Sequence, residues 1–259
     1  MPRIRQSVPL PKINFVEPTF EHQSALFCPA SQDTIHALFA PLHYEPGYAY
    51  PLIVWLHGQG SDERQLRLIM PLVSMRNYVA VAPRGVCMKE VGADEKEGYG
   101  WPHTYEQIPQ IEQHIFDAIE AASRKFNISR QRIFLAGFDC GGSTAFRVAL
   151  SHPQHFAGIL SLCGAFPSSR TPFANLSLAR KLPIFLSVGR DSTQYPASKV
   201  CENLRLFHTA GMSVTLRQYP CGHELTPQML GDVDRWIIEQ ISSTDPVQTT
   251  SSQWPCEAE

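Results

Sequence analysis

Apolar positions in this chain follow two distinct patterns. Some stretches are apolar almost throughout, which is typical of parallel strands buried on both faces of a sheet. We assign strands of this kind to residues 50–58, 77–85, 132–137, 155–164, 182–191 and 213–220. Between them, apolar residues recur every three or four positions, as at Ile108, Ile111, Ile115 and Ile119, which predicts helices with one face on the sheet. Such helices are expected at 62–75, 108–126, 142–151, 197–210 and 230–241.

The regular alternation of strands and helices predicts the α/β class, with a mostly parallel sheet, right-handed crossovers and helices on both faces. Residues 24–30 and 34–44 predict antiparallel edge strands, and residues 86–107 predict a long polar loop. No interdomain linker interrupts the pattern. We therefore expect a single domain over residues 21–243, preceded by an extended lead-in at 1–20 and followed by a disordered tail at 244–259.

The composition and charge of the chain argue against nucleic-acid binding and against insertion into a membrane. The chain is 43% hydrophobic with a net charge of −2, so it has no broad basic surface that would bind nucleic acid. No apolar run is long enough for a membrane span, and none of the length of a secretory signal is present near the N-terminus. The seven cysteines are scattered without paired metal-ligand spacing, which indicates reduced thiols and a cytoplasmic location. A small-molecule substrate is the expected partner.

Four predicted strand ends carry polar residues, and functional groups of open α/β sheets gather at that edge. The stretch Gly137-x-Asp139-x-Gly141 matches the nucleophile-elbow template G-x-S-x-G except at its centre. The order of Asp139, Asp191 and His223 is also that of an α/β-hydrolase triad. In such a site the acid orients the histidine, and backbone N–H groups, here of Gln59 and Cys140, form an oxyanion hole.

At this point the chain resembles the phospholipase/carboxylesterase (acyl-protein thioesterase-like) family of the α/β-hydrolase superfamily. The resemblance covers about residues 50–243 and rests on VWLHGQG, APRG, RIFLAGFDCGG, FAGILSLCGAFP, PIFLSVGRD and YPCGHEL. It implies a single-domain α/β-hydrolase fold without a large cap and with esterase or thioesterase ancestry. It places the acid at Asp191, the histidine at His223 and the oxyanion donors at Gln59 and Cys140. It also places Trp101 near the acyl site, as a substrate-binding residue.

Asp139 stands where this family has serine, and this departure leaves the reaction open. A carboxylate is ionised at neutral pH but is a weak nucleophile toward an acyl group. The main prediction is hydrolysis of carboxylic esters or thioesters by Asp139, Asp191 and His223, with no metal or organic cofactor. In this hypothesis Asp139 and His223 activate a water directly.

Three alternatives remain. In the first, the domain is a pseudo-enzyme that binds ligands without catalysis. In the second, Asp139 attacks an alkyl carbon and forms an ester that is then hydrolysed, as in dehalogenase and epoxide-hydrolase relatives of this fold. In the third, two carboxylates and one histidine hold a divalent metal that assists hydrolysis.

Overall fold

The computed structural model of this protein describes residues 27–28, 35–89, 97–102, 104, 106–167 and 175–244. The expected lead-in at 1–20, and the expected tail apart from its first residue, lie outside the described residues. None of the helices described is long and apolar enough to cross a membrane.

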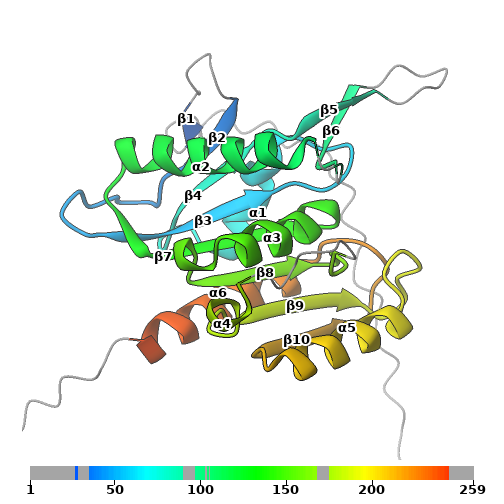
Figure 1. The fold of residues 1–259 in the computed structure, drawn as a ribbon. Helices are drawn as coiled ribbons and strands as arrows, with labels where there is room; N and C mark the ends of the chain where they lie inside the picture. The colour runs from blue at the N-terminus through cyan, green and yellow to red at the C-terminus, as the bar shows by residue number, and fades with distance from the viewer. Residues whose placement is uncertain are drawn as a thin grey trace, which may run out of the picture.

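The main sheet has eight strands in the described part of the chain, in the order β1-β2-β4-β3-β7-β8-β9-β10 (Figure 1). Six of them, from β4 to β10 in this order, run parallel. β2 pairs antiparallel with β4, and β1 pairs antiparallel with β2 at the edge. The α/β class, the mostly parallel sheet and the two antiparallel edge strands are thus confirmed. The strands are β1 (Phe27–Cys28), β2 (His36–Phe39), β3 (Tyr50–Leu56), β4 (Val79–Pro83), β7 (Ile128–Phe138), β8 (Gly158–Leu162), β9 (Ile184–Gly189) and β10 (Val214–Tyr219).

Helices cover both faces of this sheet, and the five stretches with helical spacing all form helices; the short elements η2 and α4 lie outside those stretches. Residues 62–75 divide into a 3₁₀ turn and a short α-helix, which contains Pro71. Gly211 ends the next-to-last helix in the left-handed conformation, with φ of 70°. The helices are η1 (Glu63–Gln65), α1 (Leu66–Val73), α2 (Ile108–Lys125), α3 (Cys140–Ser151), η2 (Pro153–His155), α4 (Leu176–Ala179), α5 (Ala197–Ala210) and α6 (Pro227–Thr244).

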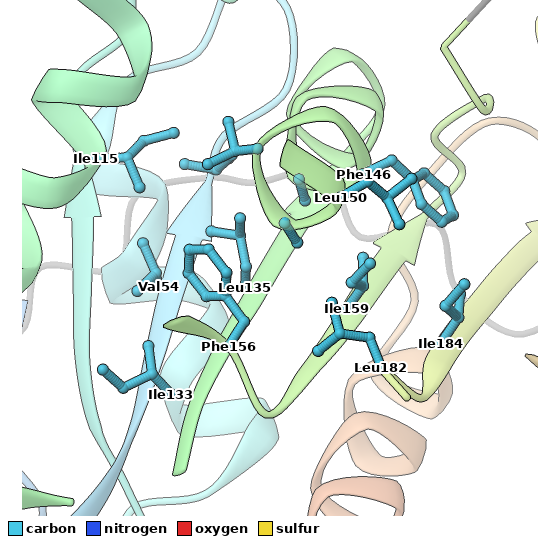
Figure 2. Packing of buried hydrophobic residues seen from close by; sticks show 14 of the residues in the cluster. Val54, Ile115, Ile133, Leu135, Phe146, Leu150, Phe156, Ile159, Leu182 and Ile184 are labelled. Atoms are coloured by element: carbon cyan, nitrogen blue, oxygen red, sulfur yellow. The ribbon is translucent and has the colours of Figure 1, made fainter. Parts of the chain in front are cut away.

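The core consists of two apolar layers, one on each face of the sheet. β3 shows the division, because successive side chains of a strand point to opposite faces. Leu52, Val54 and Leu56 pack in the layer under α2, α3 and α5, part of which is seen in Figure 2. Ile53 and Trp55 pack in the layer under α1 and α6. Burial on both faces explains why the central strands read as continuous apolar runs.

Residues 86–107 differ from the expected loop. They contain a hairpin of β5 (Val86–Lys89) and β6 (Glu97–Gly100), paired antiparallel from Val86 opposite Gly100 to Lys89 opposite Glu97. β5 is apolar up to Lys89 and half of β6 is glycine, so neither of these short strands shows the alternation of apolar and polar positions that marks a strand. Among the described residues between β8 and β9, the helical element is α4 alone, in agreement with the expected lack of a large cap.

Candidate active site

The sharp turn between β7 and α3 carries Asp139 at the carboxyl edge of the sheet. Asp139 has φ of 53° and ψ of −122°, a left-handed conformation that is strained for any residue other than glycine. The flanking glycines permit this turn: a Cβ on Gly137 would lie 2.5 Å from the backbone of Gly141, and a Cβ on Gly141 would overlap the carbonyl oxygen of Leu56. The turn therefore has the geometry of a nucleophile elbow, with a carboxylate at its apex.

The structure brings Asp139 together with His223, which follows β10. His223 Nε2 lies 3.1 Å from Asp139 Oδ1. The side chains of Asp139 and His223 retain 28% and 12% of their exposure, so the pair is partly accessible to solvent. Elements far apart in sequence form this contact because β7, β8, β9 and β10 are parallel neighbours whose carboxyl ends share one edge.

The second oxygen of Asp139 faces the predicted oxyanion donors. The backbone N–H of Gln59 donates to Asp139 Oδ2 at 3.3 Å, and the backbone N–H of Cys140 also hydrogen-bonds the carboxylate. Burial raises the pKa of the Asp139 carboxyl, but hydrogen bonds from His223, Gln59 and Cys140 outweigh burial and leave this pKa below its ordinary value. Asp139 is therefore ionised at neutral pH, and its own oxygen lies against the oxyanion donors.

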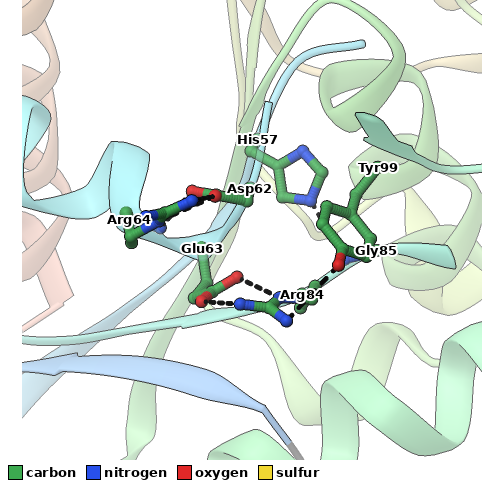
Figure 3. Close-up of polar contacts among 7 residues, drawn as sticks. All are labelled: His57, Asp62, Glu63, Arg64, Arg84, Gly85 and Tyr99. Carbon is green, nitrogen blue, oxygen red and sulfur yellow. Dashed lines mark hydrogen bonds and ion pairs between the residues drawn. The ribbon is translucent and has the colours of Figure 1, made fainter. Parts of the chain in front are cut away.

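His57 holds the loop that carries Gln59. The backbone N–H of Gly85 donates to His57 Nε2 at 3.0 Å (Figure 3). The ring proton is therefore on Nδ1, which lies 2.9 Å from the carbonyl oxygen of Gly58. Burial of the ring lowers the pKa of His57, which keeps it neutral. His57 thus fixes the shape of the loop, the structural role that this motif usually gives to its histidine.

An ion pair braces the same loop from the other side. Arg84 donates through Nε and Nη2 to the two carboxylate oxygens of the buried Glu63, each at 2.6 Å (Figure 3). The guanidinium carbon of Arg84 lies 4.7 Å from the centre of the Tyr99 ring, on β6. The carbonyl oxygen of Tyr99 accepts the N–H of Gly60 at 2.9 Å. The β5–β6 hairpin therefore supports the residues that aim the oxyanion donors.

Trp101, which is predicted to bind substrate, lies buried next to the loop that carries Gln59. Its side chain is only 2% exposed and belongs to the apolar layer under α2 and α3. Its indole N–H donates to the carbonyl oxygen of His57 at 2.8 Å, and the two rings lie 5.0 Å apart. The indole has too little exposed surface to form the wall of a substrate pocket. Through its hydrogen bond to His57, Trp101 positions the loop that carries Gln59 (the oxyanion loop).

Asp191 does not orient His223 in the structure. Its side chain is 60% exposed, and its carboxylate oxygens accept from Arg190, at 3.1 Å from Nε and 3.4 Å from Nη2. The neighbouring residue reaches the histidine instead: Ser192 Oγ lies 3.1 Å from His223 Nδ1. Ser192 is 6% exposed, and its Oγ also accepts the backbone N–H of Tyr195 at 3.1 Å. The turn after β9 therefore presents a hydroxyl, rather than the expected carboxylate, to the ring.

The backbone N–H of Cys140 faces the Asp139 carboxylate, and the thiol of Cys140 is unsuited to nucleophilic attack. Burial, together with the negative charge of Asp139, raises the pKa of the Cys140 thiol to about 12. The thiol is therefore protonated at neutral pH, whereas the thiolate is the nucleophilic form of cysteine. Within the described ranges, no group of three or more His, Cys, Asp or Glu side chains converges as ligands for a metal ion.

Ser192 and Tyr99 are the residues of this site that the sequence analysis missed. Asp191 and Ser192 lie two and three residues beyond Gly189, the end of β9, so the strand end indicates the right turn. An acid is the usual partner of the histidine in a triad, which favours Asp191, but nothing in the sequence pattern shows which of the two adjacent residues points inward. Tyr99 belongs to the unpredicted hairpin.

The fold and this edge of the sheet define a protein of the α/β-hydrolase class. Residues 47–241 match the model of the phospholipase/carboxylesterase family, so the chain belongs to that family. The chain is thus a hydrolase of this family, and its relatives include an acyl-protein thioesterase. It is 25% identical over 227 residues to acyl-protein thioesterase 1 of Gibberella zeae, which covers 83% of this chain and 94% of the relative.

Solved structures show the same fold. A carboxylesterase from Mesorhizobium loti has a TM-score of 0.65 at 17% identity, with 81% of this chain and 98% of that chain covered. Acyl-protein thioesterase 2 of Zea mays has a TM-score of 0.62 at 16% identity, with 80% and 98% covered. At these identities the likeness establishes the fold, and the chemistry of Asp139 has to be argued from this chain.

Proposed function

We propose that this protein hydrolyses carboxylic esters or thioesters of small molecules, with Asp139 acting as a general base on water. The observation that carries the proposal is the position of the Asp139 carboxylate. It lies at the elbow, ionised, in contact with His223 and beside two backbone N–H donors. Membership of a family of carboxylesterases supports the same class of substrate.

Catalysis requires the ester carbonyl to take the place of one Asp139 oxygen at the oxyanion donors. The bond from Gln59 N–H to Oδ2 is 3.3 Å long, just beyond the usual range for an amide donor, so its loss costs little. The backbone N–H groups of Gln59 and Cys140 then stabilise the negative charge that develops on the carbonyl oxygen. Oδ1 remains hydrogen-bonded to His223, which holds the carboxylate in place.

Asp139 accepts one proton from water and returns it to the leaving group within the same turnover. The carboxylate takes a proton from water as the water oxygen attacks the acyl carbon and forms the tetrahedral intermediate. When the bond from this carbon to the leaving oxygen or sulfur breaks, the protonated Asp139 returns the proton to that atom. The products are a carboxylic acid and an alcohol or thiol, and Asp139 is again ionised. Thioesters suit this route, because a thiolate leaves more readily than an alkoxide.

The test measures turnover of short acyl esters and acyl thioesters by the wild type, D139N and H223A, with each variant checked for folding. D139N removes the base with little change of shape, and turnover should fall about 10²–10⁴-fold, the usual contribution of general base catalysis. H223A should also lower turnover, because Asp139 loses its orienting donor. R190A, at the exposed ion pair with Asp191, serves as the matched control and should retain wild-type rates. Equal background rates in wild type and D139N would refute the proposal.

One observation favours a second candidate, a domain that binds ligands without catalysis. The donors of the oxyanion hole are already satisfied by a residue of the chain itself, so the ground state offers no free hole to a substrate. This candidate predicts no turnover in the wild type or in any of the three variants. The route in which Asp139 attacks an alkyl carbon has a separate test. After H223A is incubated with alkyl halides or epoxides, mass spectrometry should detect an alkyl ester on Asp139 if this route operates.

A further inference from the structure

The contacts of His223 reveal an exchange between the two ends of a Ser–His–Asp constellation. In serine hydrolases the serine lies at Nε2 of the histidine and the acid at Nδ1. In this chain the carboxylate of Asp139 lies at Nε2 and the hydroxyl of Ser192 lies at Nδ1, each at 3.1 Å. The three groups are of the same types, but the carboxylate is at the elbow and the hydroxyl is buried in the turn after β9.

Hydrogen bonding fixes where the proton of a neutral ring must be. An ionised carboxylate only accepts hydrogen bonds, so Nε2 has to carry the proton that faces Asp139. Nδ1 then has a lone pair and requires a donor. Ser192 meets this requirement, because its hydroxyl donates to Nδ1 while its oxygen accepts the N–H of Tyr195 at 3.1 Å. The chain from Tyr195 through Ser192 and His223 to Asp139 is complete, with each group satisfied.

We infer that Ser192 is a positioning residue that selects the Nε2–H tautomer when the His223 ring carries one proton, the reverse of the tautomer that a serine hydrolase needs. His223 is then a hydrogen-bond donor to Asp139 and has no lone pair to offer a nucleophile at the elbow. This inference rests on the proposed function for its catalytic meaning, but the tautomer itself does not depend on turnover. It also explains why the base at this site is the carboxylate.

A carboxylate at position 192 would have the opposite effect. It would accept from Nδ1, draw the ring proton to that side and free Nε2 to act as a base. The double variant D139S/S192D exchanges the two residue types and should therefore produce the arrangement of serine hydrolases, with the serine at Nε2 and the acid at Nδ1 of His223. D139S alone should not, because Ser192 donates to Nδ1 and gives no negative charge to stabilise the imidazolium.

The direct test is NMR of protein labelled with ¹⁵N-histidine, in which long-range proton–nitrogen correlations distinguish the two tautomers. The signals of His223 are assigned by their loss in H223Q. At pH 8 we expect Nε2–H in the wild type and Nδ1–H in D139S/S192D. An Nδ1–H tautomer or a doubly protonated ring in the wild type would overturn the inference. The tautomer of the wild type is measured in the folded protein and does not depend on turnover.

Kinetics provide the second test, with acyl ester turnover and fluorophosphonate labelling at position 139 as readouts. D139S/S192D should exceed D139S on the order of 10³-fold in kcat, since loss of the orienting acid costs about that much or more in serine hydrolases. D139S/D191N serves as the control and should match D139S. Equal kcat in D139S and D139S/S192D, with both variants folded, would contradict the exchange.

Ser192 itself is tested by S192A and S192T on the residual activity of the wild type. S192A should lower kcat and leave KM unchanged, and S192T should restore kcat because it retains the hydroxyl. A change in KM alone would refute a positioning role. If the wild type shows no turnover but has the Nε2–H tautomer, the proposed function fails and the inference on Ser192 stands. If turnover depends on Asp139 but the tautomer is Nδ1–H, the reverse holds.

Discussion

The two sides of this active site are built in different ways. On the oxyanion side, the N–H groups of Gln59 and Cys140 belong to the backbone, and buried contacts of His57 and Trp101 hold the loop that carries Gln59. On the other side, the turn after β9 presents one side chain to His223, and its neighbour Asp191 faces solvent. One side depends on the path of the chain, and the other depends on which single residue points inward.

This difference shows which parts of an enzyme site are robust to substitution. Backbone donors persist as long as the glycines and the buried braces maintain the path of the chain. Side-chain chemistry at a turn is changed by one residue without disturbing the fold. A chain can therefore have the elbow, the hole and the histidine of a hydrolase and yet differ at both residues that bond the histidine. The four predictions below test this comparison, from the largest effect to the smallest.

The largest effect is expected where the chain path itself is broken. G141A places a Cβ against the carbonyl oxygens of Leu56 and His57, which are rigid backbone atoms. We expect a loss of about 3 kcal/mol or more in the free energy of unfolding, because such overlap forces the backbone to move. G231A in α6 is the control: its Cβ meets nothing within 4 Å, so it should be neutral or stabilising. Chemical denaturation of both variants measures the contrast, and equal stability would show that the elbow does not need its glycine.

A smaller effect is expected when the loop loses one brace. W101F retains a ring but removes the N–H that donates to the carbonyl oxygen of His57. A buried carbonyl left without a partner costs about 1–3 kcal/mol, so the variant should be less stable by that order. If Trp101 positions the loop, activity should fall in kcat with KM little changed. A rise in KM with unchanged kcat would instead restore the predicted role of Trp101 in substrate binding.

The pH dependence of stability tests the charge at the elbow. The pKa of Asp139 is lowered in the folded protein, so ionised Asp139 stabilises the fold above the ordinary aspartate pKa of about 3.9. This contribution is lost as the pH falls through the lower pKa of the folded state. The free energy of unfolding of the wild type, relative to D139N, should therefore be greatest near neutrality and decline below about pH 4. A difference that grows on acidification would contradict the hydrogen bonds assigned to the carboxylate.

The smallest effect is expected at Asp191. Its carboxylate is exposed and paired with Arg190, and exposed ion pairs contribute little to stability. D191N should change the free energy of unfolding by less than about 0.5 kcal/mol and leave turnover unchanged. A large loss of turnover in D191N would show that Asp191 turns inward during catalysis and would remove the contrast between the two sides of the site.

Much of the fold was predictable because the relevant signals are local. Continuous apolar runs marked the central strands, and a period of three to four residues marked α2 and α6, since burial of a strand or a helix face imposes those periods. The β5–β6 hairpin was missed because its residues carry no such period, and its pairing with the oxyanion loop is a tertiary contact. The burial of Trp101 could not be predicted for the same reason, because it depends on packing in the apolar layer under α2 and α3 and on the contact with His57.

The sequence by itself determined the order of strands and helices, the elbow with its glycines, and the strand ends where polar residues gather. These follow from local patterns and from the rule that parallel strands end at one edge. Only the tertiary structure decided that Asp139 lies against the oxyanion donors, and that Ser192 rather than Asp191 contacts His223. Two adjacent residues in a turn point in different directions, and their direction depends on neighbours distant in the chain. The chemistry of this site depends on that choice.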